Sequence, residues 1–550
     1  MEKMRKQFIV AIMALLFLAV LMVTAVMSVP AKEHSDFRFT GNVTQLWDEP
    51  YAGANWTNAF SVRDLNGDDK ADVLVLTSSY NEATGTETAT VIAKRGSDGE
   101  HLWEEPVTGT AGTNISAFGA GDLDGDKNED VLVLISTSET ETVIAKRGSD
   151  GKHIWTELVS GTVPTLIVSA GDLGEDETGD VLVMMTTSEL DMTTFTTNTA
   201  ARLIAKRGCD GEPLWEEHVN GTGWIPPSAL LVGDLDGDGK DDVLVQMSTT
   251  ELDMASDTLT TTATVIAKRG CNGEQLWNDS VSGTVRAYIS ASRAGDLDGD
   301  EMDDVLVQMS TTELDMASGN ITMRATVIAK RGCNGEPLWE EPVDGFGWAL
   351  PAGDLDGDGM DDVLVQISST ERDTASGTST TTATVIAKRG YDGEQLWEEP
   401  VTGTELFLFA LPAGDLDGDD QADVLVQMWR YNETTRNKTA TVIAKRGHNG
   451  EHLWEESVTG MDLSALPAGD LNGDKKRDVV VHIHEYDEAT DTTKDTVIAK
   501  RGYDGKHIWT TESNGPIWVG SAWADLNGDE IADVLLGSRD QVYALGYREE

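Results

Sequence analysis

Basic residues and cysteines are both scarce in this chain, and each scarcity excludes a class of protein. Lysine and arginine together number 41 against 96 aspartates and glutamates, which gives a formal net charge of −55. Such acidity argues against a nucleic-acid ligand and against electrostatic attachment to an anionic membrane, because both partners carry negative charge. The three cysteines, Cys209, Cys271 and Cys333, occupy the same turn of three successive segments, 62 residues apart. One cysteine per segment is not a disulfide framework, so we expect free thiols.

Helical periodicity and catalytic motifs are also missing. No Gly-x-Ser-x-Gly elbow, phosphate-binding loop or catalytic Cys/His pairing occurs in the chain. The two closest histidines, His482 and His484, would share one face of a strand, but the sequence offers no further ligand beside them. The sequence therefore contains no catalytic constellation, and we expect the chain not to be an enzyme.

Only one long hydrophobic run is present, from Phe8 to Val29 with Thr24 and Ser28 interrupting it. It follows Lys3, Arg5 and Lys6, and a basic segment before an apolar one is typical of a secretory signal. Because the run is also long enough to span a bilayer, an uncleaved anchor is the alternative. We expect residues 1–31 to be a signal peptide or N-terminal membrane anchor, 32–40 a linker, 41–546 the folded domain and 547–550 a tail.

An acidic loop of nine residues, Asp-Leu-Asp/Asn-Gly-Asp-x-x-x-Asp, is abundant instead. It occurs nine times, 50 to 62 residues apart, each time before a run of Val and Leu. This spacing is that of a repeated supersecondary unit. Carboxylates at every second position of a tight loop converge oxygens on one point, as Ca²⁺ requires. The sequence therefore predicts up to nine calcium sites.

The expected metal-binding side chains stand at positions 1, 3, 5 and 9 of each loop. They are Asp64, Asn66, Asp68 and Asp72; Asp122, Asp124, Asp126 and Asp130; Asp172, Asp176 and Asp180; Asp234, Asp236, Asp238 and Asp242; Asp296, Asp298, Asp300 and Asp304; Asp354, Asp356, Asp358 and Asp362; Asp415, Asp417, Asp419 and Asp423; Asp470, Asn472, Asp474 and Asp478; and Asp525, Asn527, Asp529 and Asp533. In the third loop Gly174 replaces the second ligand, so we expect that site to be weak or empty.

Each repeat divides into four short strands separated by turn signals. In the fourth repeat these are residues 229–232, 243–247, 263–267 and 274–277, with a Thr-rich connection from Ser248 to Thr262. Four-stranded antiparallel units at this spacing predict the blades of an all-β propeller. The chain begins with a lone fourth strand at 41–47 and ends with a lone third strand at 541–545, so pairing these ends would complete a ninth blade. A ring of eight blades with one divergent unit is the alternative.

The acidic loops resemble those of FG-GAP repeats, the calcium-binding blades of integrin α-subunit propellers and of many secreted microbial proteins. The resemblance covers all nine repeats. In the fourth loop it implies the Lys240 carbonyl as a fifth ligand beside the four aspartates.

A second motif, Ala-Lys-Arg-Gly-x-Asp/Asn-Gly-x-x-Leu/Ile-Trp, is similar to the tryptophan-docking motif of quinoprotein propellers. It ends at eight tryptophans, and Trp47 supplies a ninth. One tryptophan per blade would bury a large apolar area between blades, so we expect a structural role. In the fourth repeat Lys268 and Arg269 would lie on the side of the acidic loop and offset its charge.

Function is then expected on the Thr-rich connections, such as Ser248–Thr262 and Ser310–Thr322, which would project from the face opposite the loops. Eight Asn-x-Ser/Thr sequons agree with export and glycosylation: Asn42, Asn55, Asn114, Asn220, Asn278, Asn320, Asn432 and Asn437. We expect a secreted or cell-surface binding or adhesion module whose partner is an extracellular protein or glycan. The alternative is a secreted enzyme on the same scaffold, either a polysaccharide lyase or a quinone-dependent dehydrogenase.

Overall fold

The computed structural model describes residues 38–548 apart from short segments. The segments left out are 111, 138–139, 160–162, 175, 192–195, 223–226, 254–257, 284–285, 315–320, 344, 373–378, 405, 433–436 and 488–491. The expected targeting segment, 1–31, lies outside the described residues, and all that is described belongs to the compact unit Asp36–Glu550. Within the described part, no helix has the length and apolar character needed to cross a membrane.

The described secondary structure consists of strands, which form nine blades of four antiparallel strands. Blades 1 to 3 comprise β3 (Trp56–Val62), β4 (Asp72–Asn81), β5 (Thr86–Lys94) and β6 (His101–Thr110); β7 (Asn114–Gly119), β8 (Val131–Ser136), β9 (Glu141–Lys146) and β10 (His153–Val159); and β11 (Val163–Ala170), β12 (Asp180–Asp191), β13 (Thr196–Lys206) and β14 (Pro213–Thr222). Blades 4 to 6 comprise β15 (Ser228–Leu231), β16 (Val243–Asp253), β17 (Thr258–Lys268) and β18 (Gln275–Gly283); β19 (Arg286–Gly295), β20 (Asp304–Leu314), β21 (Ile321–Lys330) and β22 (Pro337–Val343); and β23 (Phe346–Gly353), β24 (Asp362–Arg372), β25 (Ser379–Lys388) and β26 (Gln395–Gly403).

Blades 7 and 8 comprise β27 (Phe407–Gly414), β28 (Asp423–Asn432), β29 (Asn437–Lys445) and β30 (His452–Thr459); and β31 (Asp462–Pro467), β32 (Asp478–Asp487), β33 (Thr492–Arg501) and β34 (His507–Ser513). Blade 9 combines β35 (Trp518–Ala524), β36 (Asp533–Gly537) and β37 (Gln541–Tyr547) with β2 (Val43–Pro50) from the other end of the chain.

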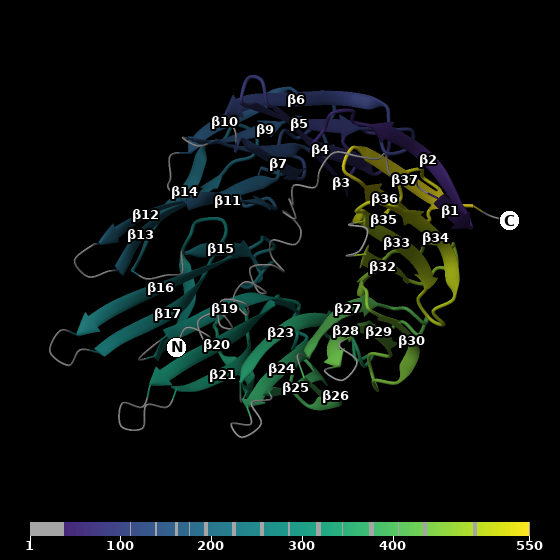
Figure 1. Ribbon diagram of the computed structural model, residues 1–550. Coiled ribbons are helices and arrows are strands. Elements are labelled where there is room, and N and C mark those ends of the chain that lie inside the picture. Colours follow the sequence, from purple (N-terminus) through teal and green to yellow (C-terminus); the bar gives the residue numbers. More distant parts are fainter. Residues whose placement is uncertain are drawn as a thin grey trace. The chain divides into compact units, whose positions relative to one another are not determined.

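The two ends of the chain close the ring as the sequence predicts. Strand β2, drawn in purple, lies beside β37, drawn in yellow, in an antiparallel ladder from Val43↔Tyr547 to Pro50↔Gln541 (Figure 1). The nine-bladed propeller is thereby confirmed, and the eight-bladed alternative is wrong. One further strand, β1 (Arg38–Gly41), pairs with β34 and adds a fifth strand to blade 8. Its first three residues, 38–40, belong to the segment 32–40 that the sequence suggested as a linker.

The Thr-rich connections contain more strand than expected. In blade 4, β16 and β17 continue past Met247 as one ladder in which Thr249 pairs with Thr262 and Asp253 with Thr258. In blade 5, Leu314 pairs with Ile321 at the end of the same kind of hairpin. Threonine is β-branched and favours the extended backbone, so these segments lengthen the strands rather than form loops. In blade 4 the strands therefore extend into the connection expected at Ser248–Thr262, past the strand ends expected at residues 247 and 263. The remaining tips, residues 254–257 and 315–320, lie outside the described residues.

The hydrophobic core lies between neighbouring blades. The second strand of each blade carries the Val/Leu run, and Val243, Leu244 and Val245 are all fully buried because both faces of the strand meet another blade. Each core cluster accordingly combines two blades, as where Leu355 and Trp397 of blade 6 pack with Val426 of blade 7. The apolar run that does not alternate is therefore the sequence signature of a central strand buried on both faces.

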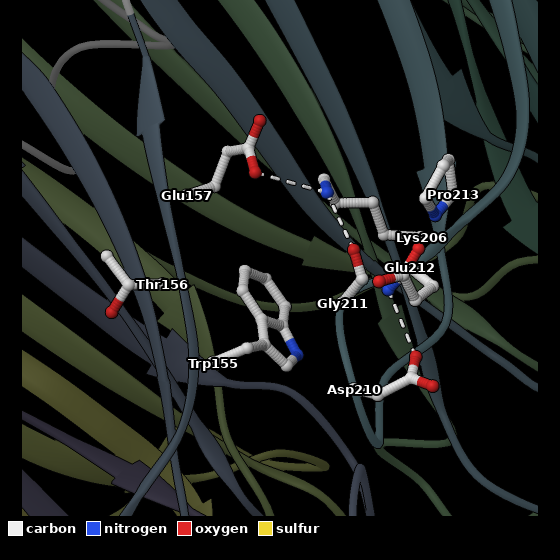
Figure 2. Close-up of a pocket in the computed structure, with 8 residues that line it drawn as sticks. All are labelled: Trp155, Thr156, Glu157, Lys206, Asp210, Gly211, Glu212 and Pro213. Atoms are coloured by element: carbon white, nitrogen blue, oxygen red, sulfur yellow. Dashed lines mark hydrogen bonds and ion pairs between the residues drawn. The ribbon is translucent and has the colours of Figure 1, made fainter.

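A tryptophan and a lysine hold neighbouring blades together at eight of the nine junctions. Between blades 2 and 3 the Trp155 indole N–H donates to the Gly208 carbonyl at 2.7 Å. The Lys206 ammonium lies 5.9 Å from the Trp155 ring centroid and bonds Glu157 at 3.2 Å and the Gly211 carbonyl at 2.7 Å (Figure 2). The indole bond recurs at Trp47, Trp103, Trp215, Trp277, Trp339, Trp397 and Trp454. The structural role expected for this motif is confirmed.

Candidate metal sites on the nine acidic loops

The carboxylate at position 1 shapes each acidic loop. In blade 4 the Asp234 side chain accepts hydrogen bonds from the backbone N–H groups of Gly237 at 2.7 Å, Asp238 at 3.1 Å and Gly239 at 2.7 Å. Positions 4 and 6 have positive φ, 79° at Gly237 and 82° at Gly239. Seven other loops hold a non-glycine residue at position 6, with φ between 61° and 73°: Asp69, Lys127, Glu177, Glu301, Asp420, Lys475 and Glu530. The loop therefore keeps a strained residue in order to wrap its backbone around the first carboxylate.

The carboxylate at position 9 holds the loop to the turn between the third and fourth strands. Asp242 is fully buried, and its two oxygens accept the backbone N–H groups of Leu235 at 2.9 Å and Gly270 at 2.8 Å. Burial raises the pKa of Asp242 to about 7, although these two hydrogen bonds oppose the shift. The same burial raises the pKa to about 7 at Asp130, Asp304, Asp362, Asp423, Asp478 and Asp533, to about 6 at Asp72, and in the same direction at Asp180. We call this residue the keystone aspartate of each loop.

Five loops bring three carboxylates together. In blades 2, 4, 6 and 7 the acidic side chains at positions 1, 3 and 9 each offer an oxygen, and these oxygens lie within 4.8 Å of one another; blade 5 does the same with positions 1, 3 and 5. The groups are Asp122, Asp124 and Asp130; Asp234, Asp236 and Asp242; Asp354, Asp356 and Asp362; Asp415, Asp417 and Asp423; and Asp296, Asp298 and Asp300. Several of these aspartate clusters can therefore hold a metal ion.

Buried oxygens without partners mark three of these groups. Oδ1 of Asp124, Asp298 and Asp417 is buried and accepts no hydrogen bond, while Oδ2 of each accepts one from an arginine. A buried carboxylate oxygen without a donor costs free energy, which a bound cation would remove. The residues present thus fit a cation held by oxygen ligands.

In the loops that carry asparagine at position 3, the asparagine side chain donates a hydrogen bond to the buried aspartate at position 9. The side-chain nitrogens of Asn66, Asn472 and Asn527 donate to the keystone aspartates Asp72, Asp478 and Asp533, at 2.9, 2.7 and 3.2 Å. Among the described residues, no group of three carboxylates forms in these loops or in blade 3, where Gly174 stands at position 3. The ligands expected in these four loops remain predictions.

The loops are also joined to one another. At eight of the nine junctions the backbone N–H at position 8 donates to the carbonyl at position 1 of the preceding blade, as from Asp303 to Asp234 at 2.7 Å and from Asp361 to Asp296 at 2.9 Å. The bond from Ala71 to Asp525, at 3.3 Å, joins blade 1 to blade 9 and carries the series across the junction of the chain ends. The acidic loops therefore form part of the ring itself.

The basic residues beside the loops divide into two roles. Arg269 bonds Oδ2 of Asp236 at 2.6 Å, as the sequence suggested. Lys268 does not contact the loop; it bonds Glu217 of the preceding blade at 2.5 Å, so its expected role in offsetting the loop charge was wrong. Lys268 is the last residue of the third strand and Arg269 is the next residue, so their side chains leave opposite faces of the extended chain.

The histidine pair has a partner that the sequence reasoning missed. His482 Nε2 and His484 Nδ1 lie 3.1 and 2.6 Å from the two oxygens of Asp495, whose Oδ2 also accepts the Ile517 backbone N–H at 2.7 Å. Asp495 is 1% exposed and replaces an alanine that other blades bury at this strand position, such as Ala440. An aspartate at a strand position where other repeats have a buried alanine is the sequence signal that could have revealed this partner. The three cysteines are free thiols, as expected.

Comparison with known proteins supports the FG-GAP resemblance. Residues 64–133 match the FG-GAP-like repeat, and the loop geometry found there recurs around the nine-bladed propeller. The chain is thus a β-propeller of FG-GAP type. No curated protein matches its sequence.

Several solved structures match the chain at low similarity. The structure of rhamnogalacturonan lyase YesW is 13% identical with a TM-score of 0.38, over 90% of this chain and 85% of that one. A Bacillus licheniformis rhamnogalacturonan lyase is 12% identical with a TM-score of 0.37, over 92% and 91%. The WD40 domain of SCAP from fission yeast is 8% identical with a TM-score of 0.31, over 93% and 98%. Likeness at this level does not indicate an activity.

Proposed function

We propose that the chain is an exported, calcium-binding β-propeller that serves as a binding or adhesion module at the cell surface. The calcium part rests on one observation: the side chains of Asp298 and Asp417 are 8% and 7% exposed, each belongs to a three-carboxylate group, and Oδ1 of each lacks a hydrogen-bond donor. An all-oxygen donor set rich in carboxylates suits a hard cation that accepts six to eight ligands, which favours Ca²⁺ over metals that prefer nitrogen or sulfur.

The N-terminal segment and the sequons support export. A basic segment followed by an apolar run directs a chain across a membrane, and calcium sites of low affinity can be filled in the extracellular medium. The net charge of −55 keeps such a protein soluble and away from anionic surfaces.

The long hairpins support a binding role. The pairs β16–β17, β20–β21 and β24–β25 extend from the end of the second strand that lies away from the acidic loop. Their polar, Thr-rich ladders stand on a ring whose blades are locked by tryptophan and by loop-to-loop bonds. A rigid scaffold that carries adjacent projecting hairpins suits recognition of an extracellular protein or glycan.

Calcium counting tests the first part of the proposal. Equilibrium dialysis of the mature chain against radioactive Ca²⁺, with excess Mg²⁺ as competitor, should give about five stronger sites, one for each three-carboxylate loop. Weaker sites should follow in the asparagine loops, and the third loop should bind least. Binding of no Ca²⁺ at millimolar concentration would refute the proposal.

A hairpin variant tests the second part. Replacing residues 251–260 with Asn-Gly keeps Thr250 and Thr261 as the closing pair of a shorter hairpin. The intact chain should bind particular glycans or envelope proteins on an array in Ca²⁺, and variants shortened in this way in blades 4 to 6 should lose that binding while keeping their melting temperature. Turnover of a polysaccharide or an alcohol by the intact chain would instead favour the enzyme alternative.

A further inference from the structure

The arginine of the Lys-Arg-Gly turn has two sets of partners in different blades. In blades 2, 4, 5 and 7 its Nε donates to Oδ2 of the position-3 aspartate of the loop at 2.6 Å, which we call the arginine clamp. The clamped pairs are Arg147–Asp124, Arg269–Asp236, Arg331–Asp298 and Arg446–Asp417.

Blade 6 has the same loop without the clamp. Its Asp356 belongs to a three-carboxylate group, but Arg389 bonds Asp392 at 3.2 and 3.0 Å and also contacts Glu394. The position-3 carboxylate therefore joins its group without help from the arginine. The clamp adds a positive charge to a site whose geometry is already formed.

In blades 4 to 7 the two arrangements follow the residue two places after the glycine of the turn. The clamped blades 4, 5 and 7 have Asn272, Asn334 and Asn449 there, and an amide does not attract the guanidinium as a carboxylate does. Blade 2 has Asp150, but Lys152 contacts this carboxylate and Arg147 remains on the loop. Blade 6 has Asp392 with Glu394 two residues later, and Asp392 accepts the arginine.

We propose that this turn residue sets the calcium affinity of the loop in its own blade by competing for the turn arginine. Asp392 removes the arginine from the blade 6 loop and makes that loop the strongest calcium site. Asn272, Asn334 and Asn449 release the arginine onto the loop and weaken their sites. The inference rests on the calcium binding proposed above and assigns a residue outside the loop as its determinant.

Electrostatics gives the direction of the effect. A guanidinium bonded to a ligand carboxylate occupies one of its oxygens and repels a dication bound at the other. The clamping arginines are 32% to 45% exposed, so solvent reduces this repulsion. With that reduction we expect a change of about tenfold in the dissociation constant, rather than the larger change of a buried pair.

The test uses the full chain with the other four three-carboxylate loops converted to the natural asparagine form, D124N, D236N, D298N and D417N, so that blade 6 holds the single strong site. Isothermal titration with CaCl₂ then measures that site. D392N should raise its dissociation constant by about tenfold. The turn itself should persist, because the Asp392 side chain accepts the Glu394 N–H at 2.9 Å and Asn272 accepts the Glu274 N–H at 2.9 Å in the same way.

Two matched variants separate the clamp from a general loss of charge. E394Q removes one negative charge near the same arginine but leaves Asp392 to hold it, so its effect should be well below tenfold. The double variant D392N/R389Q has no arginine to place on the loop and should recover the parental affinity. In the reciprocal background that keeps blade 7 instead, N449D should strengthen binding.

Calcium binding by the parental background separates the calcium proposal from the proposal about the turn residue. If the parental background binds no Ca²⁺, both the calcium proposal and this inference fail. If it binds Ca²⁺ and D392N leaves the dissociation constant within twofold, only the inference fails. It also fails if D392N/R389Q stays as weak as D392N, or if E394Q weakens binding as much as D392N does.

Discussion

Asp417→Asn is a substitution whose effect on stability should change sign with calcium. In the metal-free protein it removes a buried, nearly inaccessible negative charge from a group that contains Asp415 and Asp423. The asparagine loops show what the new side chain can do: Asn472 Nδ2 donates to its keystone aspartate at 2.7 Å. The variant should gain the same bond to Asp423.

The magnitudes follow from these contacts. A new hydrogen bond to a buried carboxylate stabilises by roughly 1–2 kcal/mol. The lost ion pair with Arg446, whose side chain is 39% exposed, costs about 1 kcal/mol or less. In EDTA the variant should therefore be as stable as the parent or slightly more stable. In Ca²⁺ at a hundred times the dissociation constant, loss of the site should remove up to about 2.7 kcal/mol of ligand-linked stability.

Urea unfolding in EDTA and in Ca²⁺, followed by tryptophan fluorescence, measures both effects. The matched control is Asp423→Asn, the same chemical change at the keystone position. Both Asp423 oxygens accept backbone N–H groups, from Leu416 at 2.9 Å and Gly447 at 3.0 Å, so an amide nitrogen must face one of these donors. This control should lose about 1 kcal/mol or more in either buffer. If Asp417→Asn destabilises the protein equally with and without Ca²⁺, position 3 is structural and the reasoning is wrong.

Three further predictions concern the scaffold. Burial raises the pKa of Asp242 from 3.8 to about 7. The stability that protonation of this group contributes is therefore fully present below about pH 4 and is lost as the pH rises through 7. The melting temperature in EDTA should rise from pH 8 to pH 5, and a fall would contradict this. Gly239→Ala places a side chain at φ 82°, where nothing lies within 4 Å, so it should cost about 1 kcal/mol in urea unfolding, while Gly515→Ala, also in open space, should cost less. Trp339→Phe deletes the indole N–H bond to the next blade and should cost about 1–3 kcal/mol, whereas Trp523→Phe, 48% exposed, should cost little; equal effects would refute the docking role.

The features that recur in every blade could be predicted from the sequence. The acidic loop, the Val/Leu strand and the terminal tryptophan appear nine times, and repetition turns a weak local signal into a firm one. The ring closure followed from the lone strands at the two ends. Chemical type and spacing suffice for these features because each blade meets the same neighbours.

The features that differ between blades could not be predicted in this way. Arg389 and Arg446 follow the same Ala-Lys motif, yet one bonds its turn and the other bonds its loop. The choice depends on two carboxylates competing for one guanidinium in space, and linear spacing does not show that competition. The role of the aspartate at position 9 could not be predicted either. The sequence does not distinguish an aspartate that accepts backbone hydrogen bonds from one that would only contact a cation.

The distribution of the asparagine loops bears on how the ring is held closed. They occupy blades 8, 9 and 1, which are consecutive around the ring and include the blade that joins the two chain ends. There the position-3 amides of Asn66, Asn472 and Asn527 bond their keystone aspartates directly. The same junction has the β2–β37 ladder and the Trp47 indole bond to Gly96 at 2.6 Å. The junction of the two chain ends is therefore held by contacts that need no ion. The loops with unsatisfied buried oxygens lie elsewhere, in blades that the continuous chain joins to both neighbours. A ring built in this way can close without a bound ion.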